Sequence, residues 1–235
     1  MMFFYPLFIS FFVTIAVMPA LIRAAKRYRL FDPFKDDELK IHKTPISFLG
    51  GVGMFLGISV GLSVFAFLNQ ELAIPILGVL ASILLIFTFG LWDDWKWKHI
   101  TQRKPMHKLA LVITVQLVAA SVLLIVGIRP EFFIPFIPSL LVSFGALLIV
   151  SNVINLEDGM DGLAGLLVLI SAVGFAFVFF WQGITLPLVL ALSLVGATLA
   201  FLKFNFPPAS IFMGDSGAYT LGSMLAILIL FLPQA

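Results

Sequence analysis

The sequence predicts an all-α fold, a polytopic bundle of about eight transmembrane helices with the N-terminus outside. Of its 235 residues, 61% are hydrophobic and 11% are charged. The mean hydropathy is +1.14, whereas about half of the residues of a soluble domain are apolar. Apolar segments of about 20 residues, the length that crosses the hydrocarbon core, recur along the whole chain. We therefore expect residues 1–235 to form a single integral-membrane domain.

The expected spans alternate between long and short connections. The spans are residues 3–22, 48–68, 73–92, 109–128, 132–150, 162–181, 184–202 and 217–233. The first has neither the basic N-terminal region nor the small-residue cleavage site of a signal peptide, so we expect it to remain as a membrane helix. In the second, Gly53, Gly57 and Gly61 recur every four residues, which favours close packing against another helix.

Charged, turn-forming or helix-breaking residues bound the later spans. The third span ends at Asp93 and Asp94, and the sixth begins at Gly162. Pro207 and Pro208 precede the last span and break any helix there. The longer, polar connections are residues 23–47, 93–108, 151–161 and 203–216, and the short ones are 69–72, 129–131 and 182–183.

The basic residues orient the predicted bundle. Of the 14 lysines and arginines, all except Arg129 lie in the four longer connections. The positive-inside rule places these connections in the cytoplasm and the N-terminus outside.

Acidic residues gather on that same predicted face, at the ends of apolar runs. A carboxylate beside a bilayer core is costly, so each is a candidate functional residue. Hard cations such as Mg²⁺ take carboxylate oxygens and leave coordination positions for phosphate. The sequence therefore predicts a metal-assisted site for an anionic substrate, and the absence of cysteine excludes thiol chemistry and cysteine-ligated zinc. The acids are Asp93, Asp94, Asp158, Asp161 and Asp215.

The first acidic cluster allows two interpretations. Asp93 and Asp94 end the third span, where two carboxylates oppose the helix macrodipole. They could form a solvated loop start that Lys96 and Lys98 balance, or they could form a magnesium or proton-transfer site.

The second cluster favours function more clearly. Asn152, Asn155, Asp158 and Asp161 are spaced by three, so on a helix they would lie on adjacent parts of its surface. Asp161 could instead cap the span that begins at Gly162. Capping would account for only one of the four side chains.

The third cluster and the basic connection stay ambiguous from composition alone. Asp215 could cap the last span, or it could bind metal while Asn205 and Phe212 recognise a base. The basic residues of 96–108, which include Lys108, could attract anionic lipid or bind a diphosphate or lipid phosphate. His42, His99 and His107 lack metal-ligand spacing and are interpreted as interfacial.

In combination, these motifs resemble one family, the polyprenyl-phosphate N-acetylhexosamine-1-phosphate transferases, or glycosyl transferase family 4. Its members include enzymes of peptidoglycan and lipopolysaccharide biosynthesis. The matching elements are His42–Pro45 with Gly50-Gly51, Asp93-Asp94, the run of residues 152–162, and Asn205–Gly217.

The resemblance implies an activity and its partners. Such enzymes transfer a sugar 1-phosphate from a UDP-N-acetylhexosamine, or from UDP-muramoyl pentapeptide, to polyprenyl phosphate such as undecaprenyl phosphate. They act at the cytoplasmic face of the cell membrane, release UMP and use Mg²⁺. Phosphoryl transfer needs a positioned metal and neutralised charge, which suits an acidic site. No nucleic-acid partner is implied, and the glycine-rich spans could support a homodimer.

The resemblance also assigns roles to residues. Asp215 is the expected magnesium ligand, with Asp94 a second candidate. The expected catalytic residues are Asp93 as the base for the acceptor phosphate, Asp94 and Asp161. The expected substrate-binding residues are Lys43 for phosphate, Asn152, Asn155 and Asp158 for the nucleotide and diphosphate, and Asn205 and Phe212 for uridine.

Two departures from the family pattern stand out. Trp97 lies where the family often carries a third charged residue, and the chain is expected to lack the family's C-terminal spans and histidine-rich loop. The form Asn205-Phe-Pro-Pro is more similar to the O-antigen and teichoic-acid branch than to the pentapeptide branch. An inactive scaffold and a carrier of anionic metabolites are the alternatives, although a carrier site would tend to lie near the bilayer midplane.

Overall fold

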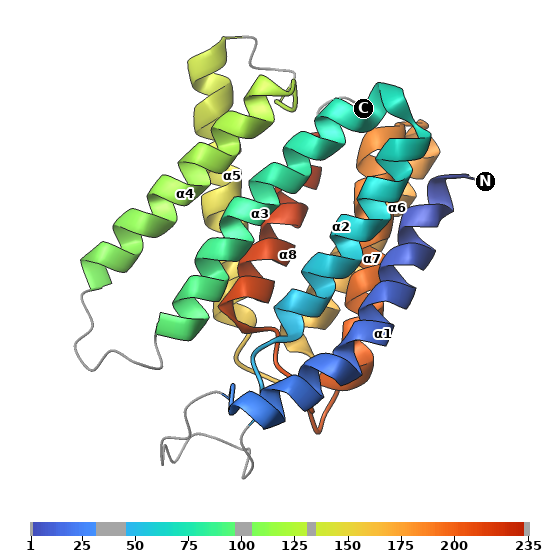
Figure 1. Cartoon of the computed structure of the whole chain (residues 1–235). Helices are drawn as coiled ribbons and strands as arrows, with labels where there is room; N and C mark the ends of the chain where they lie inside the picture. The colour runs from blue at the N-terminus through green and yellow to red at the C-terminus, as the bar shows by residue number, and fades with distance from the viewer. Residues whose placement is uncertain (1, 32–45, 97–104, 131–134, 233–235) are drawn as a thin grey trace.

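The computed structural model describes residues 2–31, 46–96, 105–130 and 135–232. These residues form two short 3-10 helices and a series of α-helices (Figure 1). The elements are η1 (Met2–Phe4), α1 (Tyr5–Tyr28), α2 (Gly50–Leu68), η2 (Gln70–Leu72), α3 (Ala73–Lys96), α4 (Pro105–Ile125), α5 (Phe136–Glu157), α6 (Leu163–Gln182), α7 (Thr185–Asn205) and α8 (Gly214–Ile229).

The helices confirm the predicted all-α membrane bundle. Seven of the described helical segments are long and apolar enough to cross a membrane. The eighth, α8, has 16 residues and is about 24 Å long, shorter than the hydrocarbon core of about 30 Å. Every residue of α8 from Ser216 to Leu228 is buried, so its neighbours shield it from lipid.

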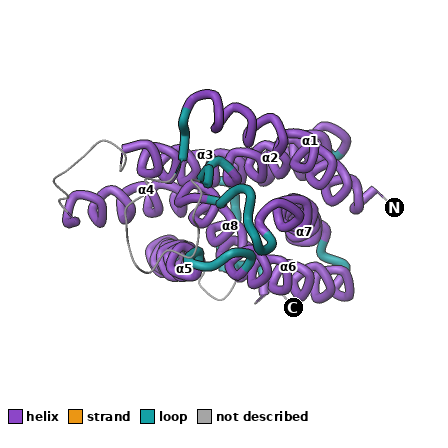
Figure 2. The backbone as a smooth tube through the Cα atoms, turned by 90° about the horizontal axis from the view of Figure 1, so that it is seen from below, coloured by secondary structure: helices purple, strands orange, loops and turns teal. Residues whose placement is uncertain are grey.

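Helix α8 lies at the centre of the bundle. It packs most extensively against α5 and α3, and it also contacts α2, α6 and α7 (Figure 2). Helix α4 leans outward and packs mainly along α3 and α5. The elements that surround α8 therefore decide what lies beside its first turn.

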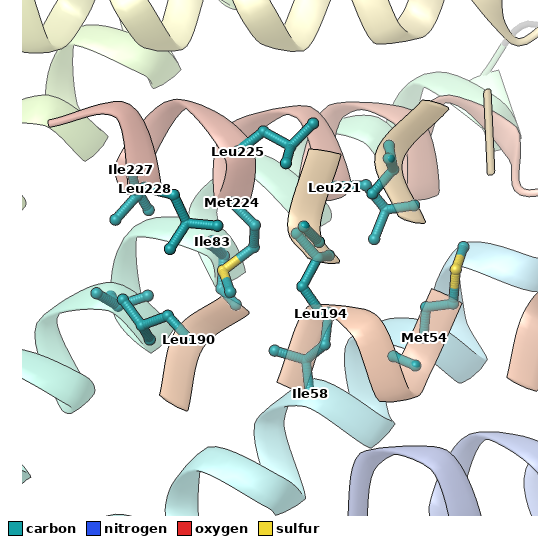
Figure 3. Close-up of a cluster of buried hydrophobic side chains, with 14 of the residues drawn as sticks. Met54, Ile58, Ile83, Leu190, Leu194, Leu221, Met224, Leu225, Ile227 and Leu228 are labelled. Carbon is teal, nitrogen blue, oxygen red and sulfur yellow. The ribbon is translucent and has the colours of Figure 1, made fainter. Parts of the chain in front are cut away.

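The core around α8 is apolar and drawn from four helices. Figure 3 shows side chains of α2, α3, α7 and α8 meeting in its middle. Met54, Ile58, Ile83, Leu194 and Met224 are fully buried there. Lipid tails are as apolar as leucine, so close van der Waals packing stabilises these contacts within a membrane.

The glycine spacing in α2 produces the predicted close packing. Thr14 of α1 donates a hydrogen bond from Oγ1 to the carbonyl of Gly53 at 3.3 Å. A Cβ atom on Gly57 would lie 2.0 Å from Thr14 Oγ1, a distance that real Cβ atoms do not reach. The α1–α2 contact therefore depends on the glycine face of α2.

One end of the bundle collects the acidic clusters, as predicted. Helices α1, α3, α5 and α7 end there and α2, α4, α6 and α8 begin there, at the lower end of Figure 1. The lysines and arginines of the described helices lie at this end, and Arg129 lies beyond the opposite end of α4.

Candidate functional site

The site rests on a backbone frame made of two distant segments. The amide of Phe212 donates to the carbonyl of Ser47 at 2.7 Å. The amides of Gly50 and Gly51 donate in turn to the carbonyls of Phe212 and Met213, each at 2.9 Å. The start of α2 and the start of α8 are thereby fixed side by side, which joins two of the motifs identified in the sequence.

Asn205 ties a second pair of segments together. Its side chain is 3% exposed. Its Oδ1 accepts from the amide of Gly162 at 3.0 Å, and its Nδ2 donates to the carbonyl of Ile211 at 2.9 Å. Both ends of the amide thus hold the turn before α6 against the loop before α8, while the predicted contact of Asn205 with uridine stays a prediction.

Asp161 strengthens the same connection. Its Oδ2 accepts from the amide of Ala209 at 2.9 Å. Gly162 occupies the N-cap position of α6. The alternative in which Asp161 caps this helix is therefore wrong. The catalytic role predicted for Asp161 stays a prediction.

Asp94 meets the first turn of α8. Its Oδ1 accepts from the amide of Asp215 at 2.8 Å, and its Oδ2 accepts from the amide of Ser216 at 3.0 Å. The capping interpretation of Asp215 is wrong, because Met213 holds the N-cap position and Asp215 lies within the helix. Asp94, from α3, satisfies two of the amides that open the helix.

Four helices bring polar side chains together around Asp215. Asn155 of α5 donates from Nδ2 to Asp215 Oδ1 at 2.9 Å, and Lys108 of α4 donates from Nζ to Asp215 Oδ2 at 3.2 Å. The same ammonium forms an ion pair with Oδ2 of Asp93 of α3. Asp93 is 3% exposed. The centre of the site is therefore the Lys108 ammonium, which lies between the carboxylates of Asp93 and Asp215.

Lys108 is the site residue that the sequence did not single out. It was grouped with the basic connection of 96–108, for which attraction to anionic lipid was an equal alternative. The available signal was its position in the first turn of α4, whose start was expected at residue 109. Because α4 begins at Pro105, about one turn before the predicted start, Lys108 is a helix residue that faces Asp93 and Asp215.

Among the described residues, carboxylates outnumber cations around Asp215. Asp158 lies just beyond α5 as its C-cap residue. Burial, together with the nearby carboxylates of Asp215 and Asp94, raises the pKa of Asp158 to about 8. At pH 7 the protonated form of the Asp158 carboxyl is therefore favoured, as expected for a buried acid beside other carboxylates.

The donor set at the centre suits a hard divalent cation. Within the described ranges, no group of three or more histidines, cysteines or acids is placed to hold a metal. Magnesium, however, is usually held by one or two carboxylates together with substrate phosphates and water. Asp93 and Asp215 already converge on one positive charge, the ammonium of Lys108, so their oxygens can share a cation.

Three predicted substrate-binding residues lie away from this centre or outside the described residues. Asn152 donates from Nδ2 to the carbonyl of Leu148, in its own helix, at 2.6 Å. Phe212 is half-buried in the loop before α8. Lys43 lies outside the described residues, as do His42, Pro45 and Trp97.

Known proteins resemble this chain over nearly its whole length. A family model described as glycosyl transferase family 4 matches residues 76–232, which include every described site residue from Asp93 to Asp215. The phospho-N-acetylmuramoyl-pentapeptide-transferase of Streptococcus mutans serotype c is 32% identical, over 96% of this chain and 71% of the relative. The enzymes of the same name from Streptococcus thermophilus (strain LMG 18311) and Streptococcus equi subsp. zooepidemicus (strain MGCS10565) are 31% and 32% identical, over 93% and 96% of this chain and 69% and 72% of theirs.

Proposed function

The chain belongs to glycosyl transferase family 4, and we propose that it transfers a sugar 1-phosphate from a UDP-sugar to polyprenyl phosphate, with release of UMP. The matched relatives are named for phospho-N-acetylmuramoyl-pentapeptide transfer. Their names favour UDP-N-acetylmuramoyl-pentapeptide as the donor, ahead of UDP-N-acetylglucosamine. This choice replaces the resemblance of Asn205-Phe-Pro-Pro to the O-antigen branch as the guide to the sugar.

One observation carries the proposal: Asp93 and Asp215, from two helices, converge on a single cation at the end of a membrane bundle. A phosphoryl transfer between a nucleotide and a lipid needs charge neutralisation where water meets the bilayer. The polar side chains at this end would bind the nucleotide sugar, and the apolar helices behind them would contact the polyprenyl chain. A carrier of anions would need a polar site nearer the middle of the bundle, where the buried polar side chains of the described helices, such as Ser82, Gln116 and Ser223, carry no charge.

Asp215, with Asp93 beside it, is proposed to hold Mg²⁺. A bound ion would neutralise the diphosphate of the donor and the developing charge on the departing UMP. Asn155 would keep Asp215 in place through its hydrogen bond to Oδ1. Lys108, whose ammonium already faces both carboxylates, would move its charge toward a substrate phosphate.

The transfer itself is proposed as a direct displacement. An oxygen of the polyprenyl phosphate forms a bond to the sugar-bearing phosphorus, and the bond from that phosphorus to the oxygen kept by UMP breaks. A phosphate monoester is already largely ionised at neutral pH, so Asp93 would accept only a remaining proton. Protonated Asp158 could donate a hydrogen bond to the uracil or the diphosphate, and Asp161, Asn205 and Phe212 would shape the surrounding loops.

The orientation of the site is also a proposal. Basic residues flank the end that carries it, so the positive-inside rule favours a cytoplasmic site in the cell membrane. The donor nucleotide would reach the site from the cytoplasm and the lipid acceptor from the bilayer. We propose that residues 1–235 act as one domain, and a homodimer remains a prediction from the sequence.

The test is UMP release by the purified chain in lipid nanodiscs. The two candidate donors are each supplied with undecaprenyl phosphate, in Mg²⁺ or in EDTA, and a reaction without acceptor serves as the control. We expect UMP only with Mg²⁺ and acceptor together, and faster release from the pentapeptide donor. UMP release that ignores the acceptor, or silence with both donors in Mg²⁺, would contradict the proposal.

A further inference from the structure

Asp93 and Asp94 are adjacent in the sequence but serve different partners. Successive residues of an α-helix point about 100° apart, so the two side chains leave α3 in different directions. Asp93 pairs with Lys108. Asp94 turns toward the backbone of α8.

The contacts of Asp94 are those of a helix cap supplied by another helix. The first amides of a helix have no partner within it. The N-cap residue of α8 is Met213, whose side chain has no oxygen to accept from them. Asp94 uses both oxygens instead, on the amides of Asp215 and Ser216 at 2.8 and 3.0 Å. Its negative charge also lies at the positive end of the helix macrodipole.

Two glycines fit around this contact. Gly90 precedes Asp94 by four residues, so both lie on the same face of α3. A Cβ atom on Gly90 would lie 2.6 Å from Ser216 Cα, and one on Gly214 would lie 2.8 Å from Asp94 Oδ2. Gly214 also has a φ of +69°, a conformation that glycine adopts without steric cost. The approach of α3 to α8 thus depends on missing side chains on both helices.

We propose that Asp94 is a positioning residue, a clasp between α3 and α8 that fixes the backbone of Asp215, and not a metal ligand or a base. Both carboxylate oxygens of Asp94 already accept from main-chain amides of α8, whereas Asp93 and Asp215 face the side-chain ammonium of Lys108. The clasp itself follows from the geometry, whereas its importance for catalysis rests on the proposed function, in which Asp215 holds the metal. Asp93 is then the member of the pair that faces the chemistry.

The first test is amide hydrogen exchange, measured by mass spectrometry on the whole chain in nanodiscs without substrate. Asp94→Asn should accelerate exchange in peptides covering 213–217 by about 2- to 30-fold, which corresponds to the ordinary range of cap energies. Asp93→Asn makes the same charge change on the same helical turn and should leave this exchange unaltered. Asp215→Asn should also leave it unaltered, because Asp94 binds the main chain of that residue.

A second variant covers the case in which Asp94→Asn does not fold. Gly90→Ala keeps both acids but forces α3 away from Ser216, so it should accelerate exchange over the same residues. Because no substrate is present, this measurement stands even if the chain proves inactive. Unchanged exchange in every variant that disturbs the clasp would overturn the proposal.

The kinetic test separates positioning from metal binding. Asp94→Asn should lower kcat for UMP release about 10- to 100-fold, as expected for a misplaced catalytic group. The Mg²⁺ concentration that gives half-maximal rate should stay within about twofold of wild type. A rise of about tenfold or more in that concentration, with exchange at 213–217 unchanged, would instead identify Asp94 as a metal ligand.

Discussion

The middle of the bundle and the end that carries the site are organised in different ways. In the middle, a cluster of leucine, isoleucine and methionine side chains packs around α8 through van der Waals contacts (Figure 3). At the site end, Asp94, Lys108, Asn155 and Asn205 each have a specific partner on a distant element. The core can therefore exchange one apolar residue for another of similar volume, whereas each polar contact at the site requires its own residue.

The largest expected effect comes from breaking the site without touching the core. Asp215→Asn removes the negative charge that accepts hydrogen bonds from Lys108 and Asn155. UMP release should therefore fall by about 100- to 1,000-fold, as for other losses of preorganised charge. Thermal unfolding in nanodiscs should change little, since the backbone bonds to Asp94 remain. Wild-type activity in this variant would remove Asp215 from the site.

The opposite change breaks the core without touching the site. Leu194 is fully buried and lies in the cluster around α8. Leu194→Ala should lower the free energy of unfolding by about 3 kcal/mol through the cavity it leaves. Chemical unfolding measures this loss, and the UMP release per folded molecule should stay near wild type. A large loss of activity in the folded fraction would show that the two regions are coupled.

Asn205 and Asn152 provide a matched pair that sharpens the comparison at the site end. Asn205→Ala would leave the amide of Gly162 and the carbonyl of Ile211 without their partner, at a cost of about 2 kcal/mol in unfolding free energy. Asn152→Ala removes only a bond to its own helix and should cost under about 1 kcal/mol. Equal losses in the two variants would mean that Asn205 does not connect the loops.

The last expected effect is a pH dependence from Asp158. Because its pKa is raised in the folded chain to about 8, the folded state holds a proton that the unfolded state has released above about pH 4. Stability should therefore fall as the pH rises from about 4 to about 8, by at most about 1.4 kcal/mol per pH unit, and level off above pH 8. Asp158→Asn should flatten this dependence in a series of melting curves, and an unchanged slope would contradict the assignment.

The same contrast explains what the sequence could predict. Hydropathy placed the spans, and the four-residue glycine spacing predicted the close contact of α2 that Thr14 and Gly57 confirm. Both signals are local and repeat along a helix. Counting the spans was enough to predict that the acidic clusters lie at the same end of the bundle, because each crossing reverses the direction of the chain.

The division of labour within the site could not be predicted in the same way. Asp94 and Asp215 are 121 positions apart, and their contact depends on how closely Gly90 lets α3 approach α8. Nothing in the local pattern separates Asp94 from Asp93, and the predicted start of the span at residue 109 leaves Lys108 among its basic neighbours. Their roles follow from which face of each helix meets α8, and the packing of the whole bundle decides that.

The most direct measurement compares UMP release by wild type, Asp215→Asn and Leu194→Ala with equal amounts of folded protein. The donor is UDP-N-acetylmuramoyl-pentapeptide, the acceptor is undecaprenyl phosphate and Mg²⁺ is present. We predict release by wild type and Leu194→Ala and almost none by Asp215→Asn. Equal release by all three would contradict the claim that the carboxylates at the end of the bundle perform the chemistry.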